Sequence, residues 1–486
     1  MENYRNEKLE QYKNHLRGKS CAVLGIGVSN IPLINFLLEC GAVVTARDKK
    51  DLAALSENPA LDIVNLKEKG VCFVTGEGYL SDLSEQIVFK TPGLRSDVAE
   101  IVEARSRGAV ITSEMEAFLS ICPCRIIAVT GSDGKTTTTT LVAKILEKAG
   151  HTVHLGGNIG KPLLYETPCM RPSDFAVLEL SSFQLHSIGF FENNPLPVPL
   201  GRFPDVAIVT NVSPNHLDWH TSYEEYADSK KAIFKNLACG GKLVTNAANE
   251  ITEKFAKEAE EDGKEVCFFS AKVKTDGYFA DDEAIYKNGE KLLLRADIKL
   301  PGVHNAENYM AAMAATEDFV TLDDVKAVAS SFGGVEHRLE YTATIDGADY
   351  YNSSIDSSPT RTIAAVSSFS DAFRKKLVLI MGGYDKNIPY DPVGEPVCRM
   401  ARAVFLCGAT ADKIETAIRE AKNFDNTTEI FKFSDFKETV VAARKYAKRG
   451  DKVILTPASA SFDLFKNFDE RGKYFKSIVH ELGNDN

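Results

Sequence analysis

A glycine-bearing turn between an apolar run and a threonine-rich helix start is the segment best suited to phosphate chemistry. It reads IIAVTGSDGKTTTTTLVAKIL over residues 126–146. Gly131 and Gly134, with the helix start that follows, would point backbone N–H groups at an anion. Lys135 would add a positive charge, and Thr136 would offer a hydroxyl ligand to Mg²⁺. A Walker A motif has four residues between its glycines. Only two lie between Gly131 and Gly134, so we predict a phosphate-binding loop of a different type.

Further polar side chains follow two buried runs. Glu179 is the last residue of the stretch FAVLE, whose other residues are apolar. His216 and Asp218 come shortly after the stretch VAIVTNV. Parallel α/β sheets bind their ligands beyond the carboxyl ends of the strands. Glu179 would then hold Mg²⁺ or orient water, and His216 would have a catalytic or metal-binding role. The alternatives are a solvated acid at a strand end and a structural histidine.

A lysine falls on the apolar face of an expected helix. Between residues 223 and 237 the apolar side chains recur at helical spacing, and Lys230 lies on their stripe whereas Lys231 does not. A lysine on a buried face must be paired, neutralised or modified. Lys230 is therefore either a functional residue or a lysine whose stem packs while its ammonium reaches solvent.

Two more segments are candidate binding sites. Near the N-terminus, CAVLGIGVSN has the Gly25-x-Gly27 turn of a nucleotide-binding strand and helix, with Asp48 about twenty residues later. The third glycine of that motif is replaced by Asn30, so a nicotinamide cofactor and a simple tight turn stay open as alternatives. Near the C-terminus, the hydroxyls of Ser459 and Ser461 are expected near a helix start, where they would suit a carboxylate-bearing ligand.

The elements that position these residues alternate in type along the chain. Short Val, Ile and Leu runs without polar alternation are typical of parallel strands buried on both faces, and helical patterns separate them. We expect an α/β protein with open, doubly wound sheets. The sections are 1–115, 116–334 and 335–486, with Gly333-Gly334 as a hinge and an antiparallel hairpin turning at Asn288-Gly289.

Composition excludes several classes of protein. The 486 residues carry a net charge of −11, which argues against a non-specific nucleic-acid binder. No run of about 18 apolar residues occurs and the first twenty residues hold no apolar segment, so we expect a cytoplasmic protein without a membrane span. Among ten scattered cysteines, Cys122 and Cys124 are the only close pair. We interpret them as free, buried thiols, with redox activity as the less favoured alternative.

Taken together, these motifs resemble those of the Mur ligase family. TGSDGKTT is similar to its short ATP loop, and GGNIG, LELSSFQL, NVSPNHLDWH, YADSKKAIF, LPGVHNAENYMAA and EHRLE follow in the family's order. The segments GIGVSN, KTPGL and SEMEAF and the ending SASFDLFKNFDERGKYF are similar to those of the members that add D-glutamate. The resemblance implies three domains: an N-terminal Rossmann-like UDP-binding domain, a central P-loop-type ATPase with a parallel sheet, and a C-terminal Rossmann-like domain.

The resemblance also implies an activity. ATP would phosphorylate the carboxylate of UDP-N-acetylmuramoyl-L-alanine, and the amine of D-glutamate would attack the acyl phosphate, a step of peptidoglycan precursor synthesis. Two Mg²⁺ ions are implied, with Lys230 carbamylated by CO₂ to support the second. No nucleic-acid partner is implied, and a monomer is expected.

The family's site residues carry over to matching positions of this chain. The catalytic positions are Lys135, Glu179, His216 and Lys230, and the metal-binding positions are Thr136, Glu179, His216 and Lys230. The ATP-binding positions are Gly131, Ser132, Asp133, Gly134, Lys135, Thr136, Thr137, Asn305, Asn308 and Arg338, with His337 at the hinge. The UDP-substrate positions are Gly27, Val28, Ser29, Asp48, Pro92, Gly93, Asn158, Ser181 and Gln184, and the D-glutamate positions are Lys386, Ser461 and Phe468.

Some residues depart from the family pattern, and two other functions stay open. Asp133 replaces the loop's usual Asn, Ser353 stands where an Asp is typical, and Ile355 where a Lys is typical; Asp356 would substitute for the missing acid. One alternative is a folylpolyglutamate synthase or a ligase for another amino acid, against which the Gly25-type turn and the ending FDLFKNFDERG argue. The other is a nucleotide-dependent switch, which would need Lys135 but neither His216 nor a lysine on a buried stripe.

Overall fold

The computed structural model describes residues 4–189, 203–217, 219–300, 302–369, 371–386 and 388–484, without the side chains of Val28, Pro59 and Asn484. Asp218 thus lies outside the described residues. The chain divides into two compact units, residues 1–297 with 304–328 and residues 298–303 with 329–486, and each is described by itself. No helix in the described ranges is long and apolar enough to cross a membrane.

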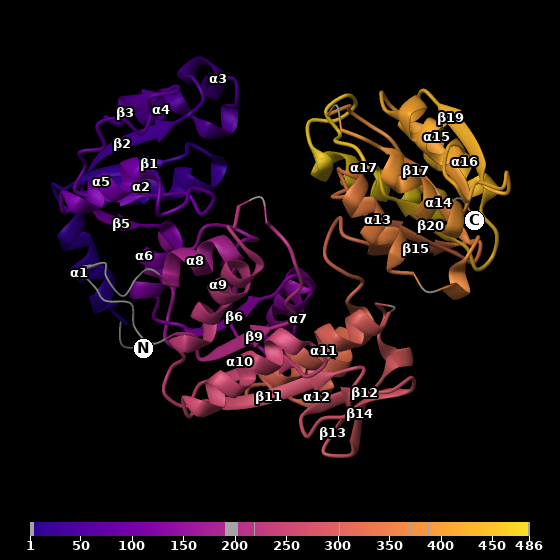
Figure 1. Ribbon diagram of the computed structural model, residues 1–486, viewed down its shortest axis with the longest axis horizontal. Coiled ribbons are helices and arrows are strands. Elements are labelled where there is room, and N and C mark those ends of the chain that lie inside the picture. Colours follow the sequence, from indigo (N-terminus) through magenta and orange to yellow (C-terminus); the bar gives the residue numbers. More distant parts are fainter. Residues whose placement is uncertain are drawn as a thin grey trace. The chain divides into compact units, whose positions relative to one another are not determined.

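The first unit begins with a five-stranded parallel sheet in the order β3-β2-β1-β4-β5 (Figure 1). The order reverses between β1 and β4, which is where open α/β sheets bind ligands. The strands are β1 (Ser20–Leu24), β2 (Val43–Asp48), β3 (Cys72–Thr75), β4 (Ile87–Phe89) and β5 (Val110–Thr112). The helices of this part are α1 (Glu7–Leu16), α2 (Ile31–Glu39), α3 (Leu52–Ser56), α4 (Ile63–Glu68), α5 (Ala99–Ser106) and α6 (Glu114–Ile121).

A nine-stranded sheet in the order β14-β13-β12-β11-β10-β9-β6-β8-β7 forms the rest of the first unit. It is parallel from β12 to β7 and ends in the antiparallel strands β13 and β14, which confirms the hairpin predicted around Asn288-Gly289. The strands are β6 (Arg125–Thr130), β7 (Val153–Gly157), β8 (Phe175–Glu179), β9 (Val206–Val209), β10 (Lys242–Asn246), β11 (Glu265–Ser270), β12 (Tyr278–Ala280), β13 (Ala284–Lys287) and β14 (Glu290–Leu294). The helices are α7 (Lys135–Lys148), α8 (Ser182–Gly189), α9 (Tyr223–Lys235), α10 (Glu250–Glu261), α11 (Val303–Thr316) and α12 (Leu322–Ser331).

The second unit is built on a six-stranded sheet in the order β15-β16-β20-β17-β18-β19, parallel except for β15. Apolar clusters cover both of its faces, as its uninterrupted apolar strands predict. The strands are β15 (Glu340–Ile345), β16 (Ala348–Asn352), β17 (Leu377–Met381), β18 (Ala401–Cys407), β19 (Glu429–Phe433) and β20 (Lys452–Leu455). The helices are α13 (Pro359–Ser367), α14 (Gly394–Met400), α15 (Ala411–Arg419), α16 (Phe436–Tyr446) and α17 (Phe468–Asn484).

The helix expected close after Ser459 and Ser461 begins later than predicted. Helix α17 starts at Phe468, because Asn467 accepts a hydrogen bond from the backbone N–H of Glu470 (2.9 Å) and so caps its first turn. Both serines are buried in the turns before it. The helix predicted directly after the serines is therefore wrong, but Ser459 Oγ lies 2.8 Å from the hydroxyl of Thr410, the residue that precedes α15.

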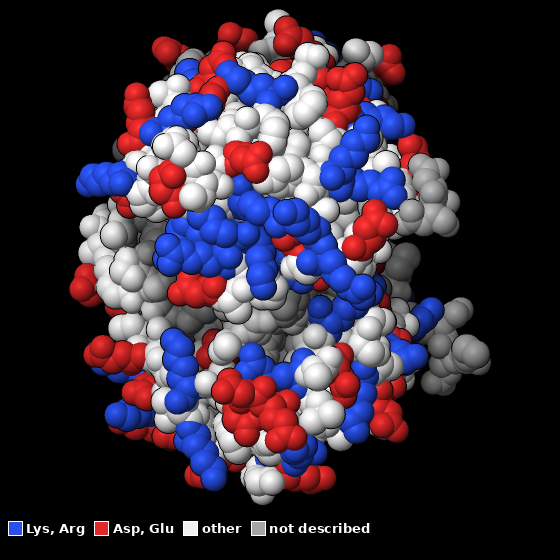
Figure 2. Space-filling view, turned by 90° about the vertical axis from the view of Figure 1, so that its right-hand side faces the viewer, with Lys and Arg blue, Asp and Glu red and all other residues white. Residues whose placement is uncertain are grey.

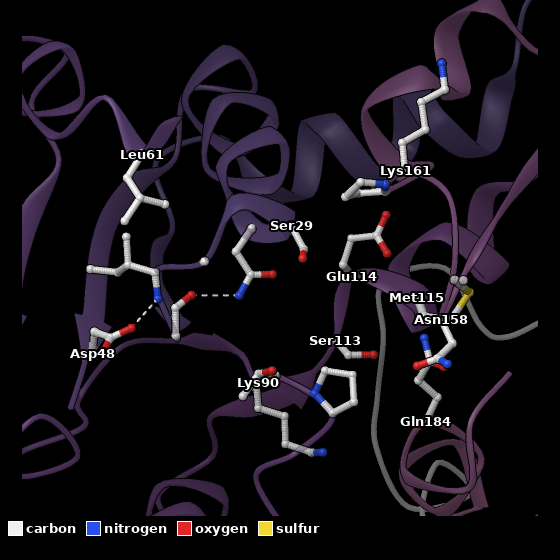
Figure 3. Close-up of a pocket in the computed structure, with 18 of the residues that line it drawn as sticks. Ser29, Asp48, Leu61, Lys90, Ser113, Glu114, Met115, Asn158, Lys161 and Gln184 are labelled. Carbon is white, nitrogen blue, oxygen red and sulfur yellow. Dashed lines mark hydrogen bonds between the residues drawn. The ribbon is translucent and has the colours of Figure 1, made fainter. Parts of the chain in front are cut away.

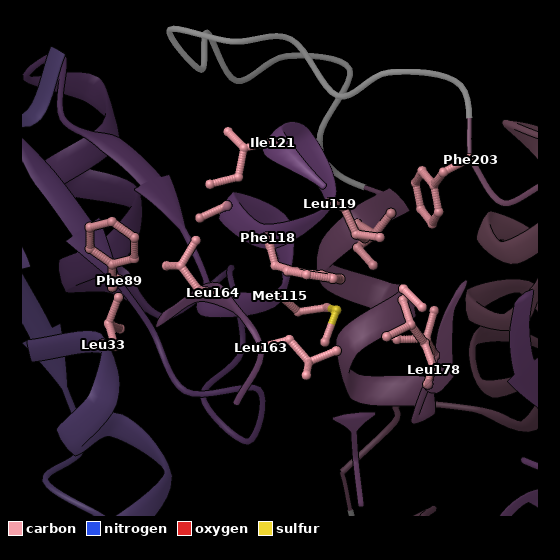
Figure 4. Close-up of a cluster of buried hydrophobic side chains, with 14 of the residues drawn as sticks. Leu33, Phe89, Met115, Phe118, Leu119, Ile121, Leu163, Leu164, Leu178 and Phe203 are labelled. Carbon is pink, nitrogen blue, oxygen red and sulfur yellow. The ribbon is translucent and has the colours of Figure 1, made fainter. Parts of the chain in front are cut away.

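One apolar core joins the two sheets of the first unit. Helix α6 supplies Phe118, which is fully buried between Phe89 of the first sheet and Leu178 of the second, with Leu163 and Leu164 beside it (Figure 4). This packing holds the glycine turn of β1 and the phosphate loop after β6 in one unit. The boundaries predicted at 115/116 and 334/335 stay predictions.

The acidic net charge is unevenly distributed. In the face drawn in Figure 2, Lys and Arg side chains gather near the middle, and Asp and Glu side chains form smaller groups around them. A net charge of −11 therefore does not exclude binding of anionic ligands, because the local field decides their approach.

Removing the Phe118 ring tests the shared core. We expect Phe118→Ala to lower the free energy of unfolding of the first unit by about 3–5 kcal/mol, the usual cost of a large cavity in a packed core. Chemical denaturation followed by fluorescence and circular dichroism measures it. The matched control is Val102→Ala on α5, whose side chain is exposed. Equal stability of the two variants would contradict the role of α6.

Candidate active site

The loop between β6 and α7 has room for glycine alone at two positions. Gly131 has φ 148°, and a Cβ there would overlap the Thr210 hydroxyl. Gly134 has φ 77°, and a Cβ there would lie 2.5 Å from Asn308 Oδ1. Both conformations are in the region that L side chains rarely adopt. The short loop is thus fixed in a specific conformation, which brings backbone N–H groups to the start of α7.

The loop is held from the segment that follows β9. Ser132 Oγ donates to the Ser213 carbonyl and accepts from its N–H, both at 2.9 Å, and lies 2.8 Å from the Tyr226 hydroxyl. The N–H of Asp133 donates to Asn211 Oδ1 (3.0 Å). The side chain of Asp133 itself is exposed, so solvent screens the unusual negative charge in the loop.

Two ammonium groups converge on one carbonyl of this loop. Lys135 Nζ donates to the Gly131 carbonyl (3.0 Å) and to the Ser132 carbonyl (2.9 Å), and Lys230 Nζ donates to the Gly131 carbonyl (3.1 Å). Lys230 is 1% exposed, which confirms its place on the buried face of α9, whereas Lys231 pairs with Glu258. Among the described residues no carboxylate forms an ion pair with Lys230.

The charge state of Lys230 follows from this setting. Burial, and then the nearby positive charge of Lys135, hold the pKa of Lys230 well below its ordinary value. Its ammonium also lies 4.5 Å from the centre of the Tyr226 ring. Lys230 therefore gives up its proton more readily than a lysine in water.

Glu179 offers an unused acceptor at the same sheet edge. It is the last residue of β8, is 1% exposed and pairs in register with Val129, two residues before the loop. Its Oε1 accepts from Asn158 Nδ2 (2.7 Å), and its Oε2 is buried without a hydrogen-bond partner. A buried carboxylate oxygen without a donor is costly, and a divalent cation would satisfy it.

The segment after β9 also carries a cluster of aromatic and imidazole rings. His216 is exposed, has φ 53° and packs against Phe183 with the ring centres 5.0 Å apart. His220, one turn later, is buried, and burial lowers its pKa to about 4. Its Nε2 lies 3.0 Å from the Ser182 hydroxyl. Because His216 is exposed and His220 is buried, His216 is the better metal-binding candidate.

Long-range contacts anchor this segment to the first sheet. Trp219 Nε1 donates to the Gly93 carbonyl (2.8 Å), and Arg95 donates to the Trp219 carbonyl (3.0 Å) and to Glu225 Oε1 (2.9 Å). The Arg95 guanidinium holds the pKa of Glu225 far below its usual range. These contacts were not predicted, because no sequence pattern indicates contacts between residues so far apart in the chain.

A cavity of about 610 Å³ opens between the glycine turn of the first sheet and the loop after β7 (Figure 3). Asp48 lies on one side and Asn158 and Gln184 lie on the other (Figure 3). Asp48 Oδ2 accepts from the N–H of Ile26 (2.6 Å), which fixes the glycine turn. Of the predicted UDP-substrate residues with described side chains, the cavity is lined by Gly27, Ser29, Asp48, Pro92, Asn158 and Gln184, and its lining does not include Gly93 or Ser181.

Lysines that the sequence analysis did not select also line this cavity. Lys50, Lys90 and Lys161 come from the first sheet and the segment after β7. Lys90 is buried, which lowers its pKa, and its Nζ donates to the Leu94 carbonyl (3.0 Å). The position of Lys90 directly after the apolar run IVF is the sequence feature that could have indicated it. The three lysines bring positive charge to the cavity, whose lining also holds the carboxyl groups of Asp48 and Glu114, and Lys161 pairs with Glu166.

Asn305 and Asn308 lie beside the phosphate loop. Asn308 Oδ1 accepts from the Thr138 hydroxyl (3.1 Å), and its Nδ2 donates to Asn305 Oδ1 (3.1 Å). The close approach of Asn308 to Gly134 places both amides at the start of α7. Thr136 and Thr137 begin the same helix, and Thr136 is buried.

The predicted residues of the second unit lie in different settings. Arg338 and Lys386 are exposed, Ser461 is buried, and Phe468 packs edge-on against His337 with the ring centres 6.0 Å apart. Arg471 was not predicted. It is buried, donates to the carbonyls of residues 354, 459 and 460, and so fixes the turn that holds Ser461.

Asp356 occupies an interior position. It is buried and accepts from the Thr456 hydroxyl (2.9 Å), and burial raises its pKa to about 6. The neighbouring Ser353 donates its hydroxyl to this carboxyl and accepts from the N–H of Leu339 (3.1 Å). Whether Asp356 substitutes for the missing acid stays a prediction.

Comparison with known proteins gives consistent similarities. Residues 129–316 match the Mur ligase middle domain, and residues 337–459 match the Mur ligase glutamate ligase domain. A relative from Acetivibrio thermocellus is 46% identical over 98% of this chain and 99% of its own length, and one from Ruminiclostridium cellulolyticum is 46% identical over 98% and 100%. Both are named UDP-N-acetylmuramoylalanine--D-glutamate ligase. The crystal structure of MurF from Acinetobacter baumannii aligns over 100% of this chain and 99% of its own with a TM-score of 0.53 at 13% identity, a likeness of fold.

Removing the charge of Glu225 tests the anchor between the two sheets. Because Arg95 lowers the pKa of folded Glu225, the carboxylate stabilises the fold above its unfolded pKa of about 4.5, and the contribution falls as the pH drops below that value. We therefore expect Glu225→Gln to lower the Tm most at neutral pH and progressively less in acid. Thermal unfolding across pH measures this.

The control for Glu225→Gln is Glu224→Gln, since Glu224 is an exposed neighbour on the same helix. It is expected to leave the Tm nearly unchanged at every pH. A Tm loss in Glu225→Gln that does not vary with pH would contradict the ionic anchor.

Proposed function

This chain belongs to the Mur ligase family, and we propose that it is an ATP-dependent ligase that joins D-glutamate to UDP-N-acetylmuramoyl-L-alanine in peptidoglycan precursor synthesis. Relatives 46% identical over nearly the whole chain carry the name of that activity. The observation that carries the proposal is the convergence of Lys135, Lys230 and the unpaired Glu179 oxygen at the loop between β6 and α7. A simple nucleotide switch has no need for the buried lysine.

The reaction begins with activation of a carboxylate, which is a poor electrophile because its leaving group would be oxide. An oxygen of the substrate carboxylate attacks the γ-phosphorus of ATP, and the bond to the β-phosphate oxygen breaks to give ADP and an acyl phosphate. The D-glutamate amine then attacks the acyl carbon. The tetrahedral intermediate loses phosphate, and the amine loses its proton, which leaves the amide.

The phosphoryl step needs positioning and neutralisation of charge more than covalent help from the protein. We propose that the N–H groups of the loop and Lys135 bind the β- and γ-phosphates. The Lys135 ammonium now lies on the carbonyls of residues 131 and 132, and its long stem lets it turn to a phosphate. Asn305 and Asn308, beside the start of α7, would orient the nucleotide, and Arg338 is the further residue that we propose to bind ATP.

The donor set fits Mg²⁺, which prefers oxygen ligands. Thr136 and Glu179 would hold one ion, and His216 with a modified Lys230 would support a second. When bound, the ions would neutralise charge on the phosphates during transfer. The buried Glu179 oxygen without a donor supports this assignment.

Lys230 is proposed to be carbamylated. Its neutral amine nitrogen would attack the carbon of CO₂ and lose a proton, which converts a buried amine into an anion. The adjacent Lys135 ammonium would stabilise that anion, whereas it repels a Lys230 ammonium. Carbamylation thus resolves the clash of two cations at one carbonyl.

The cavity in Figure 3 is proposed to bind the UDP part of the substrate. Lys50, Lys90 and Lys161 supply positive charge for a diphosphate, and Gly27 allows close approach of the turn after β1. Such a position, at the switch point of the first sheet, is the usual one for a nucleotide in an open α/β sheet.

D-Glutamate is proposed to bind in the second unit through Lys386, Ser461 and Phe468. An ammonium and a hydroxyl would face its carboxylates, and Arg471 holds the turn that carries Ser461. We further propose that the three sheets mark three domains at 1–115, 116–334 and 335–486, with Rossmann-like outer domains, and that the protein acts as a cytoplasmic monomer.

Phosphate release tests the proposed activity. With ATP, Mg²⁺ and UDP-N-acetylmuramoyl-L-alanine present, we expect phosphate to appear at a steady rate only when D-glutamate is added, with one phosphate per amide formed. L-Glutamate and D-alanine are the matched controls. Phosphate release at the same rate with and without D-glutamate would overturn the ligase assignment and would favour a nucleotide switch or another acceptor.

Substitution of the buried lysine tests its role. We expect Lys230→Ala to lower kcat by about 10²–10³-fold, the range seen when one charge-stabilising group is removed from an active site, with no recovery on addition of bicarbonate. Lys231→Ala, one residue away but paired at the surface with Glu258, should stay close to wild type. Comparable losses in the two variants would show that α9 contributes only through its fold.

A further inference from the structure

The edge of the nine-stranded sheet opposite the phosphate loop carries a separate cluster of metal-ligating side chains. Cys124 directly precedes β6, His154 is the second residue of β7, and Asp174 directly precedes β8. Because β6, β7 and β8 are parallel neighbours, their starts meet at one edge. Strand β6 separates this edge from the loop at its other end by about 20 Å, at about 3.3 Å per residue.

The ligand atoms of these three residues are already close together. Cys124 Sγ, a ring nitrogen of His154 and a carboxylate oxygen of Asp174 all lie within 4.8 Å of one another, and His154 Nε2 is 3.0 Å from Asp174 Oδ2. Tetrahedral zinc with bonds of about 2.0–2.3 Å holds its ligand atoms roughly 3.3–3.8 Å apart. The side chains therefore need only small movements to surround one ion.

The adjacent cysteine is the candidate for a fourth ligand. Cys122 follows the last residue of α6, and its thiol interacts with the Cys124 thiol, although it lies outside the group of ligand atoms within 4.8 Å of one another. Cys124 and Asp174 are buried, whereas Cys122 and His154 are partly exposed, which leaves a path for an ion to enter. Two thiols, an imidazole and a carboxylate are a donor set that favours Zn²⁺ over Mg²⁺.

In a second cluster of this kind in the described ranges, a lysine neutralises the carboxylates. Glu336, His337 and Glu340 also bring their ligand atoms within 4.8 Å. There, however, Lys476 pairs with Glu336 (2.6 Å) and with Glu340 (2.9 Å). No lysine or arginine side chain forms an ion pair with Asp174 among the described residues. Besides its contact with His154, the carboxylate accepts from the Arg171 N–H (3.0 Å) and the Ser173 hydroxyl (3.2 Å).

We propose that Cys122, Cys124, His154 and Asp174 form a structural Zn²⁺ site. Binding releases the two thiol protons, and the His154–Asp174 hydrogen bond is replaced by bonds from both side chains to the ion. All four positions are filled by protein, as in structural rather than catalytic zinc sites. The site is independent of the ligase activity.

The ion would fasten α6 to the sheet. Cys122 ends the helix whose Phe118 joins the two sheets of the first unit (Figure 4), and the other three ligands belong to the starts of three strands. A bound ion would thus stabilise the junction on which the shared core depends. Ions that bind the folded state raise its stability by mass action.

Cobalt substitution of the full, untagged chain tests the site. Metal-free, reduced protein is titrated with Co²⁺, and the thiolate-to-cobalt charge-transfer absorption and the visible bands of tetrahedral cobalt are followed. We expect both to saturate at one Co²⁺ per chain, Zn²⁺ to abolish them by displacement, and Zn²⁺ to raise the Tm. Octahedral cobalt without the charge-transfer absorption, or none bound, would overturn the proposal.

Variants assign the ligands. We expect Cys124→Ser and His154→Gln each to weaken Co²⁺ binding by at least about tenfold, the lower range for loss of a metal-site contact, and to remove the Tm rise with Zn²⁺. Because His154 is partly exposed, that variant keeps the test valid if Cys124→Ser does not fold. Retention of wild-type binding by His154→Gln would overturn the assignment.

Two controls separate this site from its competitors. Cys239→Ser changes an exposed cysteine elsewhere and should leave the cobalt spectrum unchanged, as should Glu179→Gln at the opposite edge. Thiol counting on unfolded protein kept without reductant tests the alternative of a Cys122–Cys124 disulfide. Ten free thiols support the metal site, and eight would overturn it.

Discussion

Two lysines donate to a single backbone carbonyl, and the rest of the candidate active site depends on that contact. The Gly131 carbonyl accepts from Lys135 and from the buried Lys230. Two ammonium ions cannot share such a place without a large desolvation and repulsion cost. Burial and the neighbouring Lys135 therefore favour loss of the Lys230 proton and lower the pKa of this lysine. Glu179, with one oxygen left without a donor, lies on the next strand. The Glu179 carboxylate suits a cation, and the N–H groups of the loop suit a phosphate.

The parallel sheets explain why chemistry gathers at their edges. At one edge of the nine-stranded sheet, the carboxyl ends of β6 and β8 place the phosphate loop beside Glu179. At the other edge, the starts of β6, β7 and β8 gather Cys124, His154 and Asp174. Helix α6 packs between this sheet and the first one, so the cavity of Figure 3 and the phosphate loop belong to one unit.

Features that depend on the spacing of residues close in the chain could be predicted from the sequence. The α/β class, the loop before Lys135, the strand end at Glu179, the hairpin turn and the buried stripe position of Lys230 follow from apolar runs, glycines and helical period. The start of α17 was misplaced, because the cap at Asn467 outweighs the turn near Ser461. Side-chain contacts across the fold were beyond reach.

The missed contacts share a physical reason. Arg95 and Glu225 are 130 residues apart and meet only when the first sheet packs on the segment after β9. In the same way, Cys122 and Cys124 were visible as a pair, but His154 and Asp174 come from two later strands. The spacing of residue types along the chain indicates periodic structure. It does not indicate which loops lie at the same edge of a sheet, because packing sets the strand order.

Isotope transfer tests the activation of a carboxylate at this loop most directly. UDP-N-acetylmuramoyl-L-alanine labelled with ¹⁸O in its alanyl carboxylate is converted with ATP and D-glutamate, and the released phosphate is analysed by mass spectrometry. An acyl phosphate leaves through the oxygen that came from the carboxylate, so one labelled atom is expected in each phosphate. Phosphate without label would mean that water, and not the substrate carboxylate, attacks ATP, and would contradict the ligase mechanism.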